Sequence, residues 1–160
     1  MRIGNTNMNQ EYLKSLFDYK DGQLIWKVST GKRAKVGNIA GSLGNSGYFQ
    51  ISINKKLYLS HRLIYIWHYG NIESHIHIDH INRIRNDNNI ENLRLVTCQE
   101  NNFNRGMVKG YDFHKKTNKF RAQIEINNKK INLGMFNTKE EAREAYLKAK
   151  QEIHIIKDRK

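Results

Sequence analysis

The sequence predicts an α+β protein built from two small modules, and three observations lead to this expectation. The chain has 160 residues, which suits one domain or two small ones. Its centre alternates a short apolar run, a long polar loop, a second apolar run and a helix start. Its C-terminal part alternates apolar and polar residues with period two and then changes to helical spacing. We therefore expect a first module at residues 1–104, a linker at 105–109 and a second module at 110–156.

The N-terminal elements follow from cap and turn signals. Asn9 is placed to cap a helix that runs through Phe17, and Asp21-Gly22 predicts a tight turn into a strand at 23–28. Five glycines between residues 31 and 47 predict a loop with short strands.

A hairpin and a helix are predicted next. Residues 48–53 and 57–59 are rich in β-forming side chains and flank a turn at 54–56. The apolar spacing at 62–69 predicts a helix that ends at Gly70.

The central unit is predicted as strand, loop, strand and helix. A strand at 76–78 enters Asp79-His80, a polar loop covers 81–92, and a second strand covers 93–96. Thr97-Cys-Gln-Glu100 fits a capping box, so a helix should begin there, with Asn101 in its first full turn.

The C-terminal module is predicted as a three-stranded sheet backed by one helix. Strands are expected at 111–113, 120–126 and 130–136, with Asn127-Asn128 as a turn. Thr138-Lys-Glu-Glu141 is another capping box. The helix that follows should bury four residues, namely Ala142, Ala145, Tyr146 and Ala149.

The net charge of +13 predicts a polyanionic partner, although simple solubility is the alternative. No acidic residue lies between Asp21 and Glu73, and 15 basic against 7 acidic residues follow Asn101. No apolar run approaches the roughly 20 residues that span a bilayer, and the N-terminus lacks an apolar signal core. The single cysteine, Cys98, excludes an intramolecular disulfide and a multi-cysteine zinc cage. A folded, cytosolic protein is therefore expected.

Asp79, His80, Asn92 and Asn101 form a candidate catalytic constellation. Carboxylate and amide oxygens are hard ligands that suit Mg²⁺ or Mn²⁺, and a histidine beside them can take a proton from water at neutral pH. Such a set indicates a phosphodiester hydrolase. Taken bare, an Asp-His pair is more often structural, and an Asn-rich loop is usually a solvated turn.

At these residues the sequence resembles the HNH nuclease motif of phage homing endonucleases. The resemblance covers roughly residues 18–104. It is carried by four pieces in order: Ser60-His-Arg-Leu63, Ile78-Asp-His-Ile-Asn82, Asp87-Asn-Asn-Ile-Glu-Asn-Leu-Arg-Leu-Val-Thr97 and Gln99-Glu-Asn101.

The resemblance implies a ββα-metal site with one Mg²⁺ or Mn²⁺. His80 would be the general base, Asp79 and Asn101 would hold the metal, and Asn92 would brace the loop and so orient His80. The family often has Gly-Asn where this chain has Arg83-Ile84, and we expect Arg83 and Arg85 to reach phosphate instead. The zinc-binding cysteine pairs of some members are missing, so no zinc is expected.

Three further histidines receive structural interpretations. His61 recurs in the family pattern, where packing or hydrogen bonding to the site is expected rather than catalysis. His75 and His77 are expected to form a local surface pair rather than a metal site.

The C-terminal segment resembles the Apetala/ethylene-response-factor DNA-binding domain over about residues 110–154. The most specific piece is Leu133-Gly-Met-Phe-Asn-Thr-Lys-Glu-Glu-Ala142. In that family the exposed sheet face lies in the DNA major groove, with the helix behind it.

The period-two pattern leads to the same surface. Arg121 and Gln123 are expected to point away from the helix and to read guanine and adenine edges. Flanking lysines are expected to contact phosphates, namely Lys115, Lys116, Lys119, Lys129 and Lys130. A solvated sheet face is the alternative.

The sequence as a whole predicts a sequence-directed, metal-dependent DNA endonuclease of the phage homing type that makes a nick or a double-strand break. Its partner would be duplex DNA, with no membrane and no obligate protein partner, in the cytoplasm of a bacterial host if a phage encodes it. The alternatives are a non-catalytic DNA-binding regulator on a nuclease scaffold and an RNase or toxin of related fold.

Overall fold

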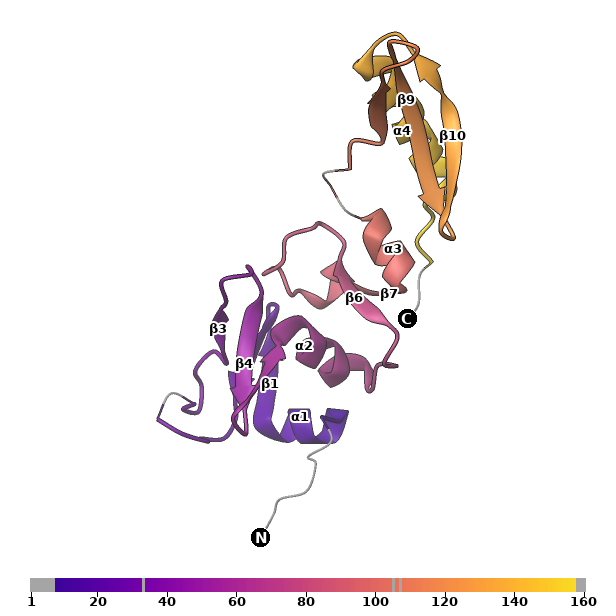
Figure 1. Ribbon diagram of the computed structural model, residues 1–160. Helices are drawn as coiled ribbons and strands as arrows, with labels where there is room; N and C mark the ends of the chain where they lie inside the picture. Colours follow the sequence, from indigo (N-terminus) through magenta and orange to yellow (C-terminus); the bar gives the residue numbers. More distant parts are fainter. Residues whose placement is uncertain (1–7, 33, 105, 107, 158–160) are drawn as a thin grey trace. The chain divides into compact units, whose positions relative to one another are not determined.

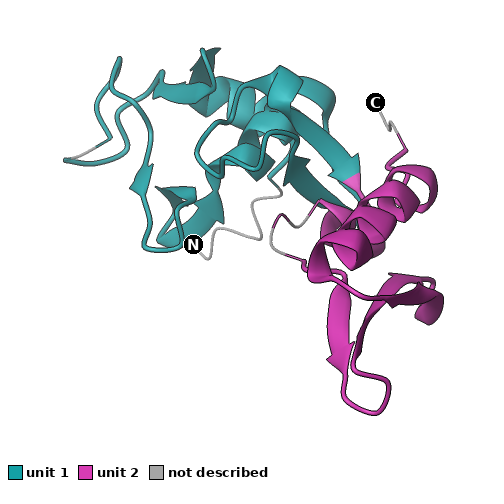
Figure 2. Ribbon diagram, turned by 90° about the horizontal axis from the view of Figure 1, so that it is seen from above, with its two compact units in different colours: residues 1–95, 160 teal, residues 96–159 magenta. Residues whose placement is uncertain are grey.

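The computed structural model describes residues 8–32, 34–104, 106 and 108–157. It is a mixed α+β protein with several small antiparallel sheets (Figure 1). The chain forms two compact units, residues 1–95 and 96–159 (Figure 2). Residues Arg105 and Met107 of the predicted linker lie outside the described residues.

The first unit begins with a helix and a hairpin. Asn9 caps α1 (Gln10–Leu16) by accepting a hydrogen bond from the Tyr12 amide. β1 (Phe17–Lys20) and β2 (Gln23–Trp26) pair antiparallel, and the turn between them has positive φ at Asp21 and Gly22. The predicted helix cap and turn are confirmed, whereas the second strand ends two residues earlier than expected.

A three-stranded sheet and a helix follow. β3 (Ser42–Leu43), β4 (Phe49–Ile53) and β5 (Lys56–Leu59) form an antiparallel sheet in that order. α2 (Ser60–Tyr69) begins directly after β5 and ends at Gly70, whose φ is 87°. The predicted hairpin and helix stop are confirmed.

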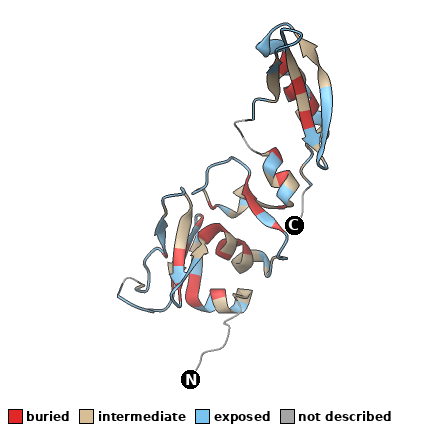
Figure 3. Ribbon diagram, in the orientation of Figure 1, coloured by how far each residue is buried: buried red, intermediate tan, exposed pale blue. Residues whose placement is uncertain are grey.

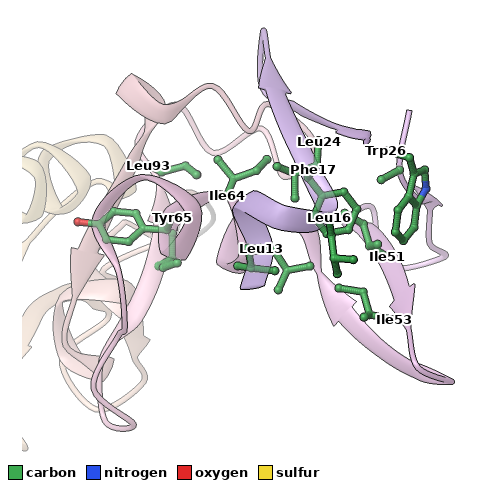
Figure 4. Close-up of a cluster of buried hydrophobic side chains, with 13 residues drawn as sticks. Leu13, Leu16, Phe17, Leu24, Trp26, Ile51, Ile53, Ile64, Tyr65 and Leu93 are labelled. Carbon is green, nitrogen blue, oxygen red and sulfur yellow. The ribbon is translucent and has the colours of Figure 1, made fainter. Parts of the chain in front are cut away.

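These elements share one hydrophobic core, in which the buried faces of α1 and α2 meet the strands (Figure 3). The close-up in Figure 4 shows side chains from α1, β1, β2, β4, α2 and β7 converging. Its largest fully buried members are Phe17, Leu13, Leu24, Ile51, Leu63 and Ile64. This core supports the two strands that carry the candidate site, because Ile78 and Leu93 belong to it.

β6 (His77–His80) and β7 (Leu93–Val96) form a two-stranded sheet. The strand before the loop therefore includes Asp79 and His80, which the sequence placed just beyond it. The intervening loop ends in a short 3₁₀ helix, η1 (Ile90–Asn92).

The second unit begins with α3 (Cys98–Phe103), whose capping box between Thr97 and Glu100 is formed as predicted. β8 (Tyr111–His114), β9 (Lys119–Ile126) and β10 (Lys129–Phe136) form an antiparallel sheet in the order β10-β9-β8. α4 (Lys139–Ile153) has the predicted capping box between Thr138 and Glu141 and packs on β9.

The core of this sheet and helix is small. Ile124, Tyr146 and Ala149 are its buried members, and Ala122 and Ala142 are also buried. Ala145, which the sequence placed in the core, is only half-buried. None of the helices among the described residues is long and apolar enough to cross a membrane.

Candidate active site

Asp79 and His80 lie at the end of β6 and are buried, with 8% and 5% of their surfaces exposed. A buried carboxylate requires a partner, and Arg94 on β7 supplies it. The Arg94 Nε and Nη2 atoms both donate to Asp79 Oδ2, at 3.0 and 2.7 Å. The sequence analysis missed Arg94; its signal was a cation between two apolar residues of a strand, Leu93 and Leu95.

His80 is held through one nitrogen of its ring. Its Nε2 atom lies 2.9 Å from Oδ1 of Asn88, whose side chain is also buried. Because an amide oxygen only accepts hydrogen bonds, Nε2 is the donor in this contact. The sequence placed Asn88 in a polar loop without a role of its own, and the structure shows that it packs inward onto the candidate base.

Asn92 ties the ends of the 81–92 loop together. Its Oδ1 accepts from the Asn82 amide at 3.0 Å, and its Nδ2 donates to the carbonyl oxygen of Asp87 at 2.8 Å. Hydrogen bonds from Asn89 and Asn82 lower the pKa of Asp87 below its ordinary value, so this carboxylate remains an acceptor for the loop. The Asn92 side chain thus bonds to the backbone on both sides of the turn.

His61 on α2 is the neighbour of His80. Their ring centroids lie 5.0 Å apart, and the Tyr48 ring lies 5.3 Å from His61 and 6.0 Å from His80. Burial, with smaller contributions from His80 and Arg62, lowers the pKa of His61 to about 3. His61 is therefore neutral at physiological pH, in agreement with a packing role.

The β1–β2 hairpin packs against the 81–92 loop. The Ile90 amide donates to the Tyr19 hydroxyl at 3.1 Å. A Cβ atom on Gly22 would lie 2.8 Å from the Asn89 nitrogen and 3.0 Å from the Asn88 carbonyl carbon. The turn therefore touches the segment that carries Asn88.

The two arginines expected at phosphate lie in the same loop. Arg85 donates from Nη1 to the Ser46 carbonyl oxygen at 2.9 Å, and its guanidinium lies 5.2 Å from the Tyr48 ring centroid. Arg83 is exposed and has a φ of 65°, at the position where the resembled family often has glycine. Both side chains come from the loop beside the candidate base.

Asn101, the second expected metal ligand, lies on α3 in the second unit and is half-buried. Within that unit the face of α3 that carries Glu100 and Phe103 contacts the C-terminal segment. Phe103 stacks on His154 with ring centroids 3.9 Å apart, and the Lys157 amide donates to Glu100 Oε1 at 3.2 Å. Metal binding by Asn101 stays a prediction.

The sheet of the second unit displays the predicted DNA-reading side chains, together with an acid that the sequence analysis did not single out. Asp112 on β8 accepts from Arg121 through both carboxylate oxygens and from Gln123 through Oδ1. The Arg121 hydrogen bond is the main cause that lowers the pKa of Asp112. The five lysines expected at phosphates are all exposed, namely Lys115, Lys116, Lys119, Lys129 and Lys130.

The donor chemistry at Asp79 fits a hard divalent cation. The described residues contain no cluster of three or more His, Cys, Asp or Glu that could hold a metal, so a site here would need amide or water oxygens as further ligands. The carboxylate already pairs with a cation, the Arg94 guanidinium.

Comparison with known proteins gives a family match for the segment that contains this site. Residues 58–103 match the model of the HNH endonuclease family. A protein of Acanthamoeba polyphaga mimivirus, described as an uncharacterized HNH endonuclease, is 32% identical over 122 residues. The match covers 74% of this chain and 65% of that relative. No solved structure shows a significant match. The segment with Asp79, His80 and Arg94 therefore lies within the stretch, residues 58–103, that matches the HNH endonuclease family.

Proposed function

We propose that this protein is a divalent-metal-dependent DNA endonuclease of the homing type. One observation carries the proposal: inside the HNH-matching segment, a buried histidine with a fixed ring lies beside a buried carboxylate. A general base and a metal ligand in adjacent positions are the minimum that phosphodiester hydrolysis needs.

His80 takes the proton of the attacking water on Nδ1, because Asn88 occupies Nε2. The water oxygen forms a bond to phosphorus, the bond to the 3′ oxygen breaks, and the products carry 5′-phosphate and 3′-hydroxyl ends. As the resemblance implies, Asp79 and Asn101 would hold Mg²⁺ or Mn²⁺, which would supply positive charge at the scissile phosphate. Asn92 fixes the loop and so keeps Asn88 against His80.

We further propose that the second unit binds duplex DNA with the sheet face opposite α4, as the Apetala-type resemblance implies. The exposed lysines at the strand ends support phosphate contacts. Asp112 orients the reading groups. Because Gln123 donates to Asp112 through Nε2, its carbonyl oxygen is directed toward other partners and suits a base amino group.

The test is plasmid cleavage. Supercoiled plasmids that carry random inserts are incubated with the protein and Mg²⁺ or Mn²⁺, and nicked and linear products are measured on gels. We expect products only when metal is present and His80 is intact. Asn88→Ala should slow cleavage about 10- to 100-fold, because the ring of His80 loses its orienting partner.

Asn86→Ala is the matched control, since Asn86 is an exposed asparagine of the same loop. It should cut at the wild-type rate. Equal cleavage by wild type and His80→Ala would refute the assignment of the base. Tight binding without cleavage of any DNA, across a library that contains bound targets, would favour a regulator.

A further inference from the structure

The ion pair between Arg94 and Asp79 lies where the proposed function needs a metal. Both donating atoms of Arg94 engage the same oxygen, Oδ2. The two side chains are only 22% and 9% exposed, so water screens their attraction less than it screens a surface pair. The carboxylate is thus already neutralised by a cation of the protein itself.

A divalent cation at Asp79 and the Arg94 guanidinium would repel each other. Arginine is protonated at every accessible pH, so the conflict cannot be relieved by loss of a proton. Each cation therefore weakens the binding of the other to the carboxylate. Binding of both requires a second anion at the site.

Duplex DNA supplies such an anion. A guanidinium fork binds phosphate with two parallel hydrogen bonds, as it binds a carboxylate. The net charge of +13 favours the arrival of a polyanion. A phosphate near the candidate base would thus offer Arg94 an equivalent partner.

We propose that Arg94 is the exchangeable counter-ion of Asp79, which leaves the carboxylate for a DNA phosphate when substrate binds. Metal binding and DNA binding are then coupled, and the metal site reaches its full affinity only with DNA present. The coupling is reciprocal, so metal also strengthens DNA binding. This inference rests on the proposed function, because it concerns the regulation of the same site.

The experiment measures Mn²⁺ binding to the DNA-free protein from the electron paramagnetic resonance signal of free Mn²⁺. Arg94→Met removes the charge and keeps an unbranched side chain, and it should bind Mn²⁺ roughly tenfold more tightly than wild type or better. Arg94→Lys keeps the charge and should bind as weakly as wild type. Arg143→Met is the matched control, because that arginine on α4 donates to the Val108 and Lys109 carbonyl oxygens within the second unit, and it should leave Mn²⁺ affinity unchanged.

A second measurement keeps Arg94 in place in its main arm, so that arm does not depend on the folding of an Arg94 variant. The affinity for a fluorescently labelled duplex is measured by anisotropy with and without Mn²⁺, in the His80→Ala background to prevent cleavage. We expect Mn²⁺ to raise the affinity severalfold when Arg94 is present, and to raise it less in Arg94→Met.

The counter-ion role would be overturned if Arg94→Met bound Mn²⁺ no more tightly than wild type. It would also be overturned if Mn²⁺ did not change the DNA affinity of the His80→Ala protein. Asp79→Asn distinguishes this failure from that of the proposed function. If Asp79→Asn leaves Mn²⁺ binding unchanged in both the wild-type and the Arg94→Met chains, the metal site itself is refuted, and the counter-ion role with it.

Discussion

His61 makes the stability of the first unit depend on pH in a defined direction. Its pKa is about 3 in the folded chain, against an ordinary value of 6.5. Between these values the unfolded chain binds a proton that the folded chain does not. The contribution of His61 to the free energy of unfolding is therefore fully present above pH 6.5. It falls by about 1.4 kcal/mol per pH unit as the pH falls toward 3.

We predict that His61→Phe removes this part of the acid sensitivity. Urea unfolding at pH 7, 6 and 5 should show a shallower loss of unfolding free energy in the variant than in wild type. His75→Gln is the control, because the His75 side chain is 69% exposed and its Nδ1 atom lies 3.5 Å from a carboxylate oxygen of the exposed Glu73. An unchanged pH slope in His61→Phe would contradict the prediction.

At the scale of elements, the β1–β2 turn packs directly against the 81–92 loop. Gly22→Ala places a methyl group 2.8 Å from the Asn89 nitrogen at a φ of 76°. We expect a loss of roughly 1–3 kcal/mol of unfolding free energy, measured in urea, together with slower cleavage because Asn88 is displaced. DNA affinity should not change, since the turn carries no predicted DNA contact.

Gly37→Ala separates packing from backbone strain. Gly37 has a φ of 81°, but a Cβ atom there meets nothing within 4 Å. This variant should lose only the part of the unfolding free energy that comes from backbone strain at a positive φ. Its cleavage rate should equal that of wild type. Equal losses of stability and cleavage in the two variants would show that the turn does not act on the loop through contact.

Local signals predicted the elements well, because caps and alternation involve residues close in the chain. Asn9, Thr97 and Thr138 each cap the helix expected of them. Partners in space were harder to predict. Arg94 and Asp79 are 15 residues apart, and their pairing depends on how β6 and β7 align.

The inward turn of Asn88 could not be predicted from its own neighbours either. It lies among asparagines that look alike in the sequence, and only one of them is turned onto His80. The Gly22 turn, which comes from a distant part of the chain, packs against the backbone at Asn88 and Asn89. Composition identified the loop as polar, and the three-dimensional fold decided which amide points inward.

At the scale of the whole molecule, the charge predicts how DNA binding responds to salt. Each lysine that contacts a phosphate contributes about 0.9 to the slope of log affinity against log salt. Lys129→Gln with Lys130→Gln should therefore reduce the slope by about 2. The dissociation constant for a labelled duplex is measured by fluorescence anisotropy at salt concentrations between about 50 and 200 mM. Over this range the affinity of a protein with roughly ten phosphate contacts falls strongly.

Lys139→Gln with Lys148→Gln is the control of equal charge. Both residues are exposed on α4, the helix behind the sheet. Their removal should leave the slope nearly unchanged. The sheet would not be the binding face if both double variants altered the slope equally.

The division of the chain between Leu95 and Val96 also determines how parts of this protein can be exchanged with those of relatives. A chimera joined at residue 105 separates Phe103 from the His154 ring on which it stacks. A chimera joined at residue 96 keeps that contact but carries Asn101 along with the incoming C-terminal sheet. Recombination that swaps the sheet as an intact unit therefore also replaces a proposed metal ligand, so the proposed DNA-reading face and one proposed ligand of the metal are inherited together.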